Sequence, residues 1–177
     1  MDRNLGDRVA WYSDNDNNTN NELNNLGPIT ALNYLNSKTS NWSNIPTIEN
    51  YIYDNNLNGT TNTYGYQKLV ITDGKGELTS QDGVMTELTG PIRARMLTRE
   101  EANSLKTING EKTPDYLLKN LSNLNTAESP YGYWFLTSDL SSSRYGRYMS
   151  YSGYIEAYYD VYDLNGRGVR PVITLKK

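Results

Sequence analysis

The stretch SSSRYGRYMSYSGYIEAYYDVYDLNGRGVRPVITLKK, residues 141–177, changes character in its middle and decides the fold prediction. As far as Asp163 it consists mainly of Tyr, Ser, Arg, Gly and Asp, and from Val169 it reads as an apolar strand. Two Tyr-rich arms, residues 145–151 and 154–162, flank Ser152-Gly153, which is typical of a two-residue β-hairpin. The final GVRPVITL is predicted to close a sheet, with Pro171 at an edge, a strand end or a bulge.

The first half of the chain carries signals for helices and a second hairpin. Pro28 precedes apolar residues at helical spacing (Ile29, Leu32 and Leu35), so a short helix is expected there. Residues 66–83 predict a hairpin that turns at Asp73-Gly74.

The segment PIRARMLTREEANSL, residues 91–105, gives the clearest local signal. Alternating apolar residues predict a strand over 92–96, and Thr98 followed by Glu101 forms a capping box that opens a helix. Thr113-Pro114 indicates another helix start. We interpret Arg93, Arg95 and Arg170 as side chains that pin loops or form ion pairs, rather than as ligand contacts.

These signals predict an α+β domain in which two or more helices pack on a small, twisted, mostly antiparallel sheet. The 177 residues suit one well-cored domain. Much of the core is expected to come from Trp134, Leu136, Val169, Val172, Ile173 and Leu175.

Composition excludes several classes of function. The formal net charge of -3 leaves no basic face for nucleic acid. The chain has neither Cys nor His, which removes thiol nucleophiles, His bases and the usual transition-metal ligands. Asp14 starts a loop resembling a calcium site, but Thr19 and Asn25 occupy its required Gly and Glu positions. No metal or cofactor is therefore expected.

No membrane helix or signal peptide is recognisable, so membrane attachment is expected only through an anchor that precedes this sequence.

The Tyr-rich hairpin is the candidate binding face. Seven tyrosines fall between Tyr145 and Tyr162, more than a core could satisfy with hydrogen-bond partners. Tyr, Ser, Gly and Arg are typical of recognition surfaces, where they are common contact residues. The alternative is that cross-strand tyrosine pairs only stabilise an exposed hairpin. The candidate ligand contacts are Tyr145, Arg147, Tyr148, Tyr151, Tyr154, Glu156, Tyr158, Asp160 and Tyr162.

The strand GYWFLTS, the polar hairpin and the closing GVRPVITL resemble the C-terminal half of C-type lectin domains of the formylglycine-generating-enzyme type. The whole chain, including RARMLTREEANSL, is similar to the globular part of pilin-like surface proteins of Gram-positive gut bacteria. It also resembles the variable proteins of diversity-generating retroelements, which display a hypermutated C-terminal patch on this fold.

The resemblance implies a single domain, 1–177, with a scaffold over 1–138, a variable binding region over 139–167 and a closing strand over 168–177. Mutation of template adenines turns Asn codons into Tyr, Ser, Asp, Gly or Arg codons. Residues 141–163 contain no Asn although the rest of the chain is rich in it. The implied function is non-enzymatic display of a recognition surface outside the cell or on its surface. Its partner would be a protein or glycan on another cell or phage, or other pilin subunits.

Two departures limit what the resemblance implies. Sulfatase-activating members of the wider family use cysteines, and calcium-dependent lectins use Glu-Pro-Asn, Gln-Pro-Asp and Trp-Asn-Asp motifs. This sequence contains none of these. Neither sulfatase activation nor calcium-mediated sugar binding is therefore expected.

Two other functions compete with ligand display. One is a purely structural pilin-like subunit. The other is a carboxylate-based hydrolase using Glu156 and Asp160, but residues four apart on a strand are about 13 Å apart, which is too far for a glycosidase pair. Ser150 and Ser152 have no nucleophile-elbow motif and no evident base.

Overall fold

A computed structural model of the chain describes residues 11–12, 26–55, 64–108, 132–150, 153–161 and 167–175. In these residues it contains two helices and three sheets, so the α+β prediction is confirmed. The helices are α1 (Ile29–Thr39) and α2 (Arg99–Ile108). The strands are β1 (Asn50–Asp54), β2 (Gln67–Thr72), β3 (Lys75–Ser80), β4 (Met85–Glu87), β5 (Arg95–Met96), β6 (Gly132–Ser138), β7 (Tyr145–Ser150), β8 (Ile155–Asp160), β9 (Arg167–Val169) and β10 (Pro171–Val172).

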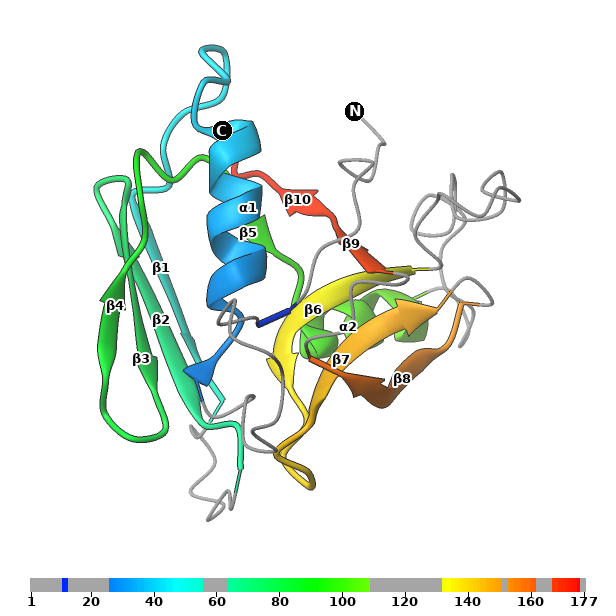
Figure 1. Ribbon diagram of the computed structural model, residues 1–177. Helices are drawn as coiled ribbons and strands as arrows, with labels where there is room; N and C mark the ends of the chain where they lie inside the picture. The colour runs from blue at the N-terminus through cyan, green and yellow to red at the C-terminus, as the bar shows by residue number, and fades with distance from the viewer. Residues whose placement is uncertain are drawn as a thin grey trace.

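The layers are plain in the ribbon view (Figure 1): one four-stranded sheet lies on the left, α1 stands in the middle, and the second four-stranded sheet lies on the right. The first sheet has the order β1-β2-β3-β4, the second has the order β8-β7-β6-β9, and β10 pairs with β5. All pairs are antiparallel except β6 with β9, which is parallel. Neither described helix is long and apolar enough to cross a membrane.

The predicted first helix and first hairpin are confirmed. In α1 the side chains of Leu32 and Leu35 are buried on the face that meets the core. Strands β2 and β3 turn at Asp73 and Gly74, whose φ angles are 48° and 74°. Two successive positive φ angles are those of a two-residue hairpin turn, for which Asp-Gly is well suited.

The segment before α2 behaves as its pattern predicts. Ile92, Ala94 and Met96 are all buried, although only Arg95–Met96 pairs as a strand. The capping box is formed in full: Thr98 N–H donates to Glu101 Oε2 at 2.9 Å, and Glu101 N–H donates to Thr98 Oγ1 at 3.1 Å. The helix start predicted at Thr113-Pro114 lies outside the described residues.

The three arginines interpreted as structural make structural contacts. Arg95 forms an ion pair with Glu101 at 2.6 Å. Arg93 donates to the carbonyl oxygens of Ser40 and Ile45 and so pins that loop. Arg170 lies 4.5 Å above the ring of Tyr133.

Strand β6 is buried on both faces and joins the two core clusters. Trp134 and Leu136 face the main cluster with Leu69, Ile71 and Val169, as predicted. Tyr133 and Phe135 face a second cluster beside α2, with their rings edge-to-face at 5.7 Å. A strand buried on both faces needs no polar alternation, which explains the unbroken apolar run.

The closing strand departs from the prediction. It splits into β9, which pairs with β6, and β10, which pairs with β5 on a different sheet. Val169 is fully buried and Val172 is half-buried, but Ile173 and Leu175 are 37% and 71% exposed. The core assignment of Ile173 and Leu175 is therefore wrong, because the chain has left the sheet before it reaches them.

Candidate functional site

The β7–β8 hairpin is present, and the candidate contacts on it have very different environments. Tyr154 is 65% exposed, whereas Tyr145, Arg147 and Glu156 are half-buried. Tyr151 and Tyr162 lie outside the described residues, as do the side chains of Tyr158 and Asp160. The described candidates therefore do not form one uniformly exposed face.

Tyr148 contradicts the expectation of an exposed contact, because only 1% of it is exposed. Its ring packs edge-to-face on Trp134 at 5.8 Å, and the Arg167 guanidinium lies 4.3 Å above it. Its hydroxyl donates to Glu156 Oε2, which lies directly opposite on β8. Tyr148 thus supports the sheet from within the core and cannot contact a ligand at the surface.

A cleft of about 680 Å³ involves the hairpin region. It lies between β1, the start of α2 and the chain that leaves β6. Its walls are residues 51–55, 98–101 and 137–141, together with Arg147 of β7. The volume is in the range of small-ligand sites, and of the described candidate contacts Arg147 lines it.

One wall is held by Asp139, which starts the segment expected to carry recognition. Asp139 Oδ1 accepts hydrogen bonds from Ser141 N–H at 2.9 Å and from Ser141 Oγ at 2.8 Å. Arg147 Nη2 lies 3.3 Å from the same oxygen, and Asp139 N–H donates to the Tyr145 carbonyl at 3.0 Å. These bonds close a short loop that leaves Leu140 partly exposed and Ser141 exposed at the cleft.

A second set of hydrogen bonds at the cleft centres on Thr137. Thr137 Oγ1 bonds the Tyr53 hydroxyl at 3.0 Å and accepts the Arg99 N–H at 3.0 Å. It also lies 3.2 Å from Glu100 Oε2. Burial raises the pKa of Tyr53 above its ordinary value. This network joins β1, α2 and β6, so the cleft is built on rigid elements.

Arg95 links Tyr51 and Glu101 in a second network at the N-terminal end of α2. Arg95 binds Glu101 through two nitrogens, at 2.6 and 2.8 Å, and stacks 4.4 Å above the Tyr51 ring. Burial raises the pKa of Tyr51 to about 12, in spite of the nearby Arg95 charge. Burial acts to raise the pKa of Glu101 too, but its bonds with Arg95 and Thr98 hold that pKa below its ordinary value.

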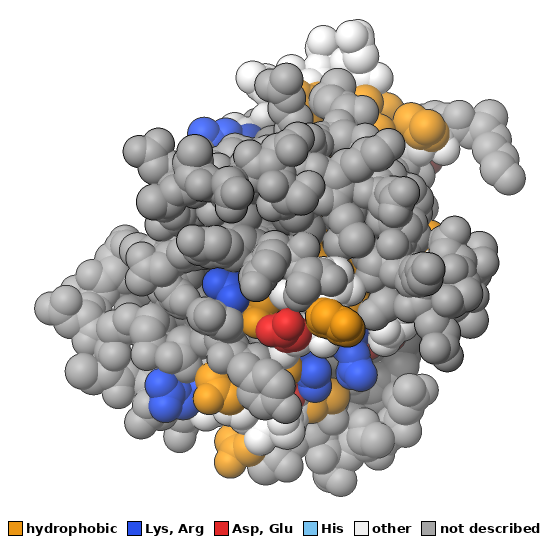
Figure 2. Space-filling view, turned by 90° about the vertical axis from the view of Figure 1, so that its right-hand side faces the viewer, with side chains coloured by type: hydrophobic (Ala, Val, Ile, Leu, Met, Phe, Trp, Pro, Cys, Tyr) orange, Lys and Arg blue, Asp and Glu red, His pale blue; other side chains and the backbone are white. Residues whose placement is uncertain are grey.

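The cleft is lined by charged side chains of both signs. Glu101 pairs with Arg95 and Asp139 with Arg147, and the lining also includes Asp54, Arg99 and Glu100. On the side of the molecule that Figure 2 views, basic and apolar side chains also lie near an acidic one. Such a mixed lining suits a ligand with both hydrogen-bond donors and acceptors and no large net charge.

The geometry gives no support to the competing catalytic residues. Ser150 is buried, and its hydroxyl bonds the backbone of Tyr154 at 3.1 and 3.2 Å, as a turn residue would. Glu156 is bonded to Tyr148. Ser152 and the side chain of Asp160 lie outside the described residues. In the described parts of the chain, no three acidic residues gather as a metal site would require, and the calcium-like loop at 14–25 also lies outside them.

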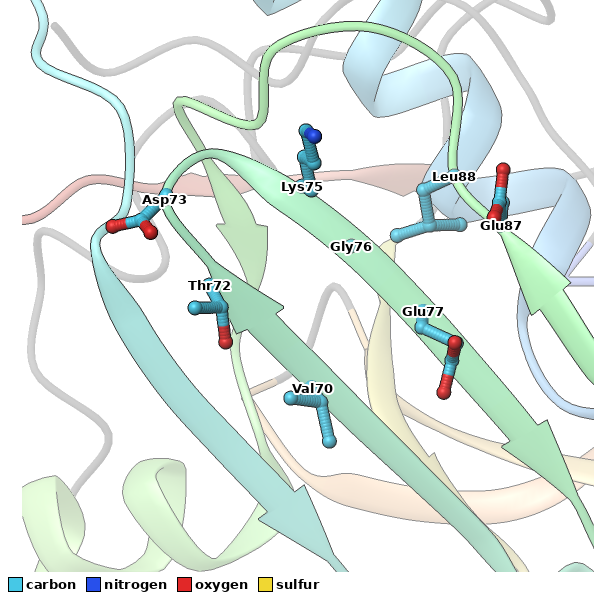
Figure 3. A pocket seen from close by; sticks show the side chains of 8 residues that line it. All are labelled: Val70, Thr72, Asp73, Lys75, Gly76, Glu77, Glu87 and Leu88. Carbon is cyan, nitrogen blue, oxygen red and sulfur yellow. The ribbon is translucent and has the colours of Figure 1, made fainter.

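A second hollow, of about 560 Å³, lies on the first sheet (Figure 3). Its side chains come from β2, β3 and β4 and the adjoining turn, with Glu77 directly opposite Glu87 in the register. None of its described lining residues belongs to the 139–167 region. We therefore regard the cleft beside β1 as the candidate site.

Sequence reasoning missed the contribution of β1 to this site. Residues 50–54, Asn-Tyr-Ile-Tyr-Asp, alternate aromatic with other side chains, which is a strand signal.

Comparisons of the chain with protein-family models, with curated proteins and with solved structures found no match.

Proposed function

We propose that this domain binds a ligand without catalysing a reaction, and that residues 139–167 supply its recognition surface. The observation that carries the proposal is that, in the described part of that region, buried side chains and cleft-lining side chains are different residues. Tyr148, Met149, Ala157 and Val161 are buried and complete the sheet, whereas Leu140, Ser141 and Arg147 line a cleft. Recognition and folding are thus assigned to different side chains of one segment.

Main-chain hydrogen bonds hold the backbone of this region. Val161 N–H donates to the Arg144 carbonyl at 2.9 Å, and Ser150 N–H donates to the Tyr154 carbonyl at 2.8 Å. Backbone atoms are the same whatever side chains the positions carry. Replacement of the surface side chains should therefore leave the scaffold in place, as a display domain requires.

The finer assignment follows the resemblance of the sequence. We propose a C-type lectin fold of the formylglycine-generating-enzyme type that presents a variable patch outside a bacterial cell. The partner would be a protein or glycan of another cell or phage. In a purely structural pilin-like subunit the cleft would have no ligand.

The test compares ligand capture by matched variants. The wild-type protein is screened against a displayed peptide library and a glycan array, and the retained probes are measured again with Leu140→Ser/Tyr154→Ser. The control, Ile173→Ser/Leu175→Ser, removes two exposed apolar side chains outside residues 139–167. Both variants should keep the thermal midpoint of the wild type.

We expect the first variant to lose at least tenfold in affinity and the control to lose none, because exposed anchor residues contribute on the order of 2 kcal/mol. Equal binding by all three proteins, or capture of no probe by the wild type, would refute the proposal in favour of a structural subunit.

A further inference from the structure

Among the described strands, β1 lies at an edge of the first sheet, and its register fixes which of its backbone groups point outward. Asn55 N–H donates to the Gln67 carbonyl, and Asp73 N–H donates to the Glu49 carbonyl. Hydrogen-bonded pairs alternate along antiparallel strands. Residues 51 and 53 therefore bond to β2, and the N–H and C=O of Ile52 point away from the sheet.

The candidate cleft runs along this outward edge. Tyr51 and Tyr53 lie on the inner face of the sheet, opposite buried Ile71 and Leu69, while Ile52 lies on the outer face. All residues from 51 to 55 nevertheless line the cleft. Side chains of both faces can line one hollow only if it follows the strand edge. Among the described residues, none makes a hydrogen bond to the backbone of Ile52.

The edge of β1 lacks the usual protection against pairing with another strand. Edge strands are commonly blunted by Lys, Pro, bulges or short length. β1 has five residues with no Lys or Pro, pairs with β2 without a register shift, and exposes 66% of Ile52. At the other edge of the same sheet, β4 has only three residues.

We propose that the cleft takes an extended peptide segment of a protein partner, which adds to β1 as a fifth strand of the first sheet. The proposal rests on the proposed function and deepens it, because it selects a protein rather than a glycan as the ligand. Main-chain hydrogen bonds to Ile52 would supply affinity, and side chains of alternating direction would supply specificity.

The geometry defines the segment. Five residues of β1 span about 16 Å, so about five residues of the partner pair with it. A β-branched or aromatic side chain beside exposed Ile52 would remove apolar surface from water. Side chains directed to the other face would meet Arg99, Glu100 and Leu140. Leu140, in the region predicted to vary, would select the sequence together with Arg99 and Glu100 of the scaffold, and the edge of β1 would hold the backbone.

The experiment uses peptides selected from the displayed library on the wild-type protein. Their affinities are measured for Ile52→Pro and Ile52→Thr. Both variants lose the Ile side chain, but only Pro lacks the outward N–H, and Pro is tolerated at an edge whose N–H faces away from the sheet. Met85→Pro makes the same change at the outward N–H of β4, since Leu88 and Val84 bond inward to β3.

We expect Ile52→Pro to bind the peptides at least tenfold more weakly than Ile52→Thr, and Met85→Pro to bind like the wild type. Hydrogen exchange at the Ile52 amide should slow when peptide binds. If Ile52→Pro fails to fold, the peptides are N-methylated at alternate positions instead, and methylation in one register should abolish binding.

The outcomes separate this inference from the proposed function. Peptides that depend on Leu140 and Tyr154 but bind Ile52→Pro and Ile52→Thr equally would overturn strand addition and leave the display function standing. If the wild-type protein retained glycans but no peptides, strand addition would likewise be overturned and the display function would stand. Loss of peptide binding in Ile52→Pro only, with no effect of Leu140→Ser/Tyr154→Ser, would support the strand site and refute recognition by residues 139–167.

Discussion

Tyr148 and Glu156 face each other across the β7–β8 pair, and the Tyr148 hydroxyl donates a hydrogen bond of 2.5 Å to the Glu156 carboxylate. Burial and, after it, this hydrogen bond raise the pKa of Tyr148 above its ordinary value. The hydroxyl of an almost wholly buried tyrosine thus has the hydrogen-bond partner that it needs, a carboxylate on the neighbouring strand β8.

Tyr148→Phe should destabilise the domain by about 1–3 kcal/mol, because it leaves a half-buried carboxylate without its donor. Urea unfolding measures the change. Tyr154→Phe is the matched control: Tyr154 is exposed, so its variant should stay within about 0.5 kcal/mol of the wild type. Similar losses in both variants would show that the Tyr148–Glu156 bond contributes little.

Gly132→Ala should disrupt the pairing of β6 with β7. A Cβ at this position would lie 2.0 Å from the Met149 carbonyl oxygen, and backbone cannot move aside as a flexible side chain can. The expected loss exceeds about 3 kcal/mol and should appear as a lower thermal midpoint.

Gly83→Ala provides the comparison, since a Cβ there meets nothing within 4 Å but the φ of 74° is strained for Ala. It should cost about 1 kcal/mol. If Gly132→Ala were no more costly than Gly83→Ala, the close approach of β6 and β7 would be wrong.

Glu101 should make stability depend on acid pH. Its pKa is lower in the folded protein than in the unfolded chain, so its contribution is present above the unfolded value of about 4.3. That contribution is lost as the pH falls through the folded value. Urea unfolding at several pH values from about 7 to about 3 should show this loss.

Glu101→Gln should flatten that pH dependence, because Gln still completes a capping box but carries no charge for Arg95. The prediction requires that Glu101→Gln be less stable than the wild type at neutral pH and that its stability change less on acidification. An unchanged acid slope in Glu101→Gln would mean that other carboxylates account for it.

Local chemistry in the sequence was sufficient to predict several elements. Pro28, the Asp73-Gly74 turn and the Thr98–Glu101 capping box act within a few residues of chain, so no tertiary contact is needed to define them. The alternation of Ile92, Ala94 and Met96 likewise identified a buried face, because side-chain direction alternates along any strand.

The sequence by itself thus determined where α1 and α2 begin, where the β2–β3 hairpin turns, and that the fold is α+β. Only the tertiary structure decided that Tyr148 is buried, that the closing strand changes sheets after Val169, and that β1 meets residues 137–141 across a cleft. The alternation within a hairpin gives two faces but not which of them other elements cover. Burial depends on contacts between residues far apart in the chain, such as Tyr53 with Thr137, and no local pattern encodes them.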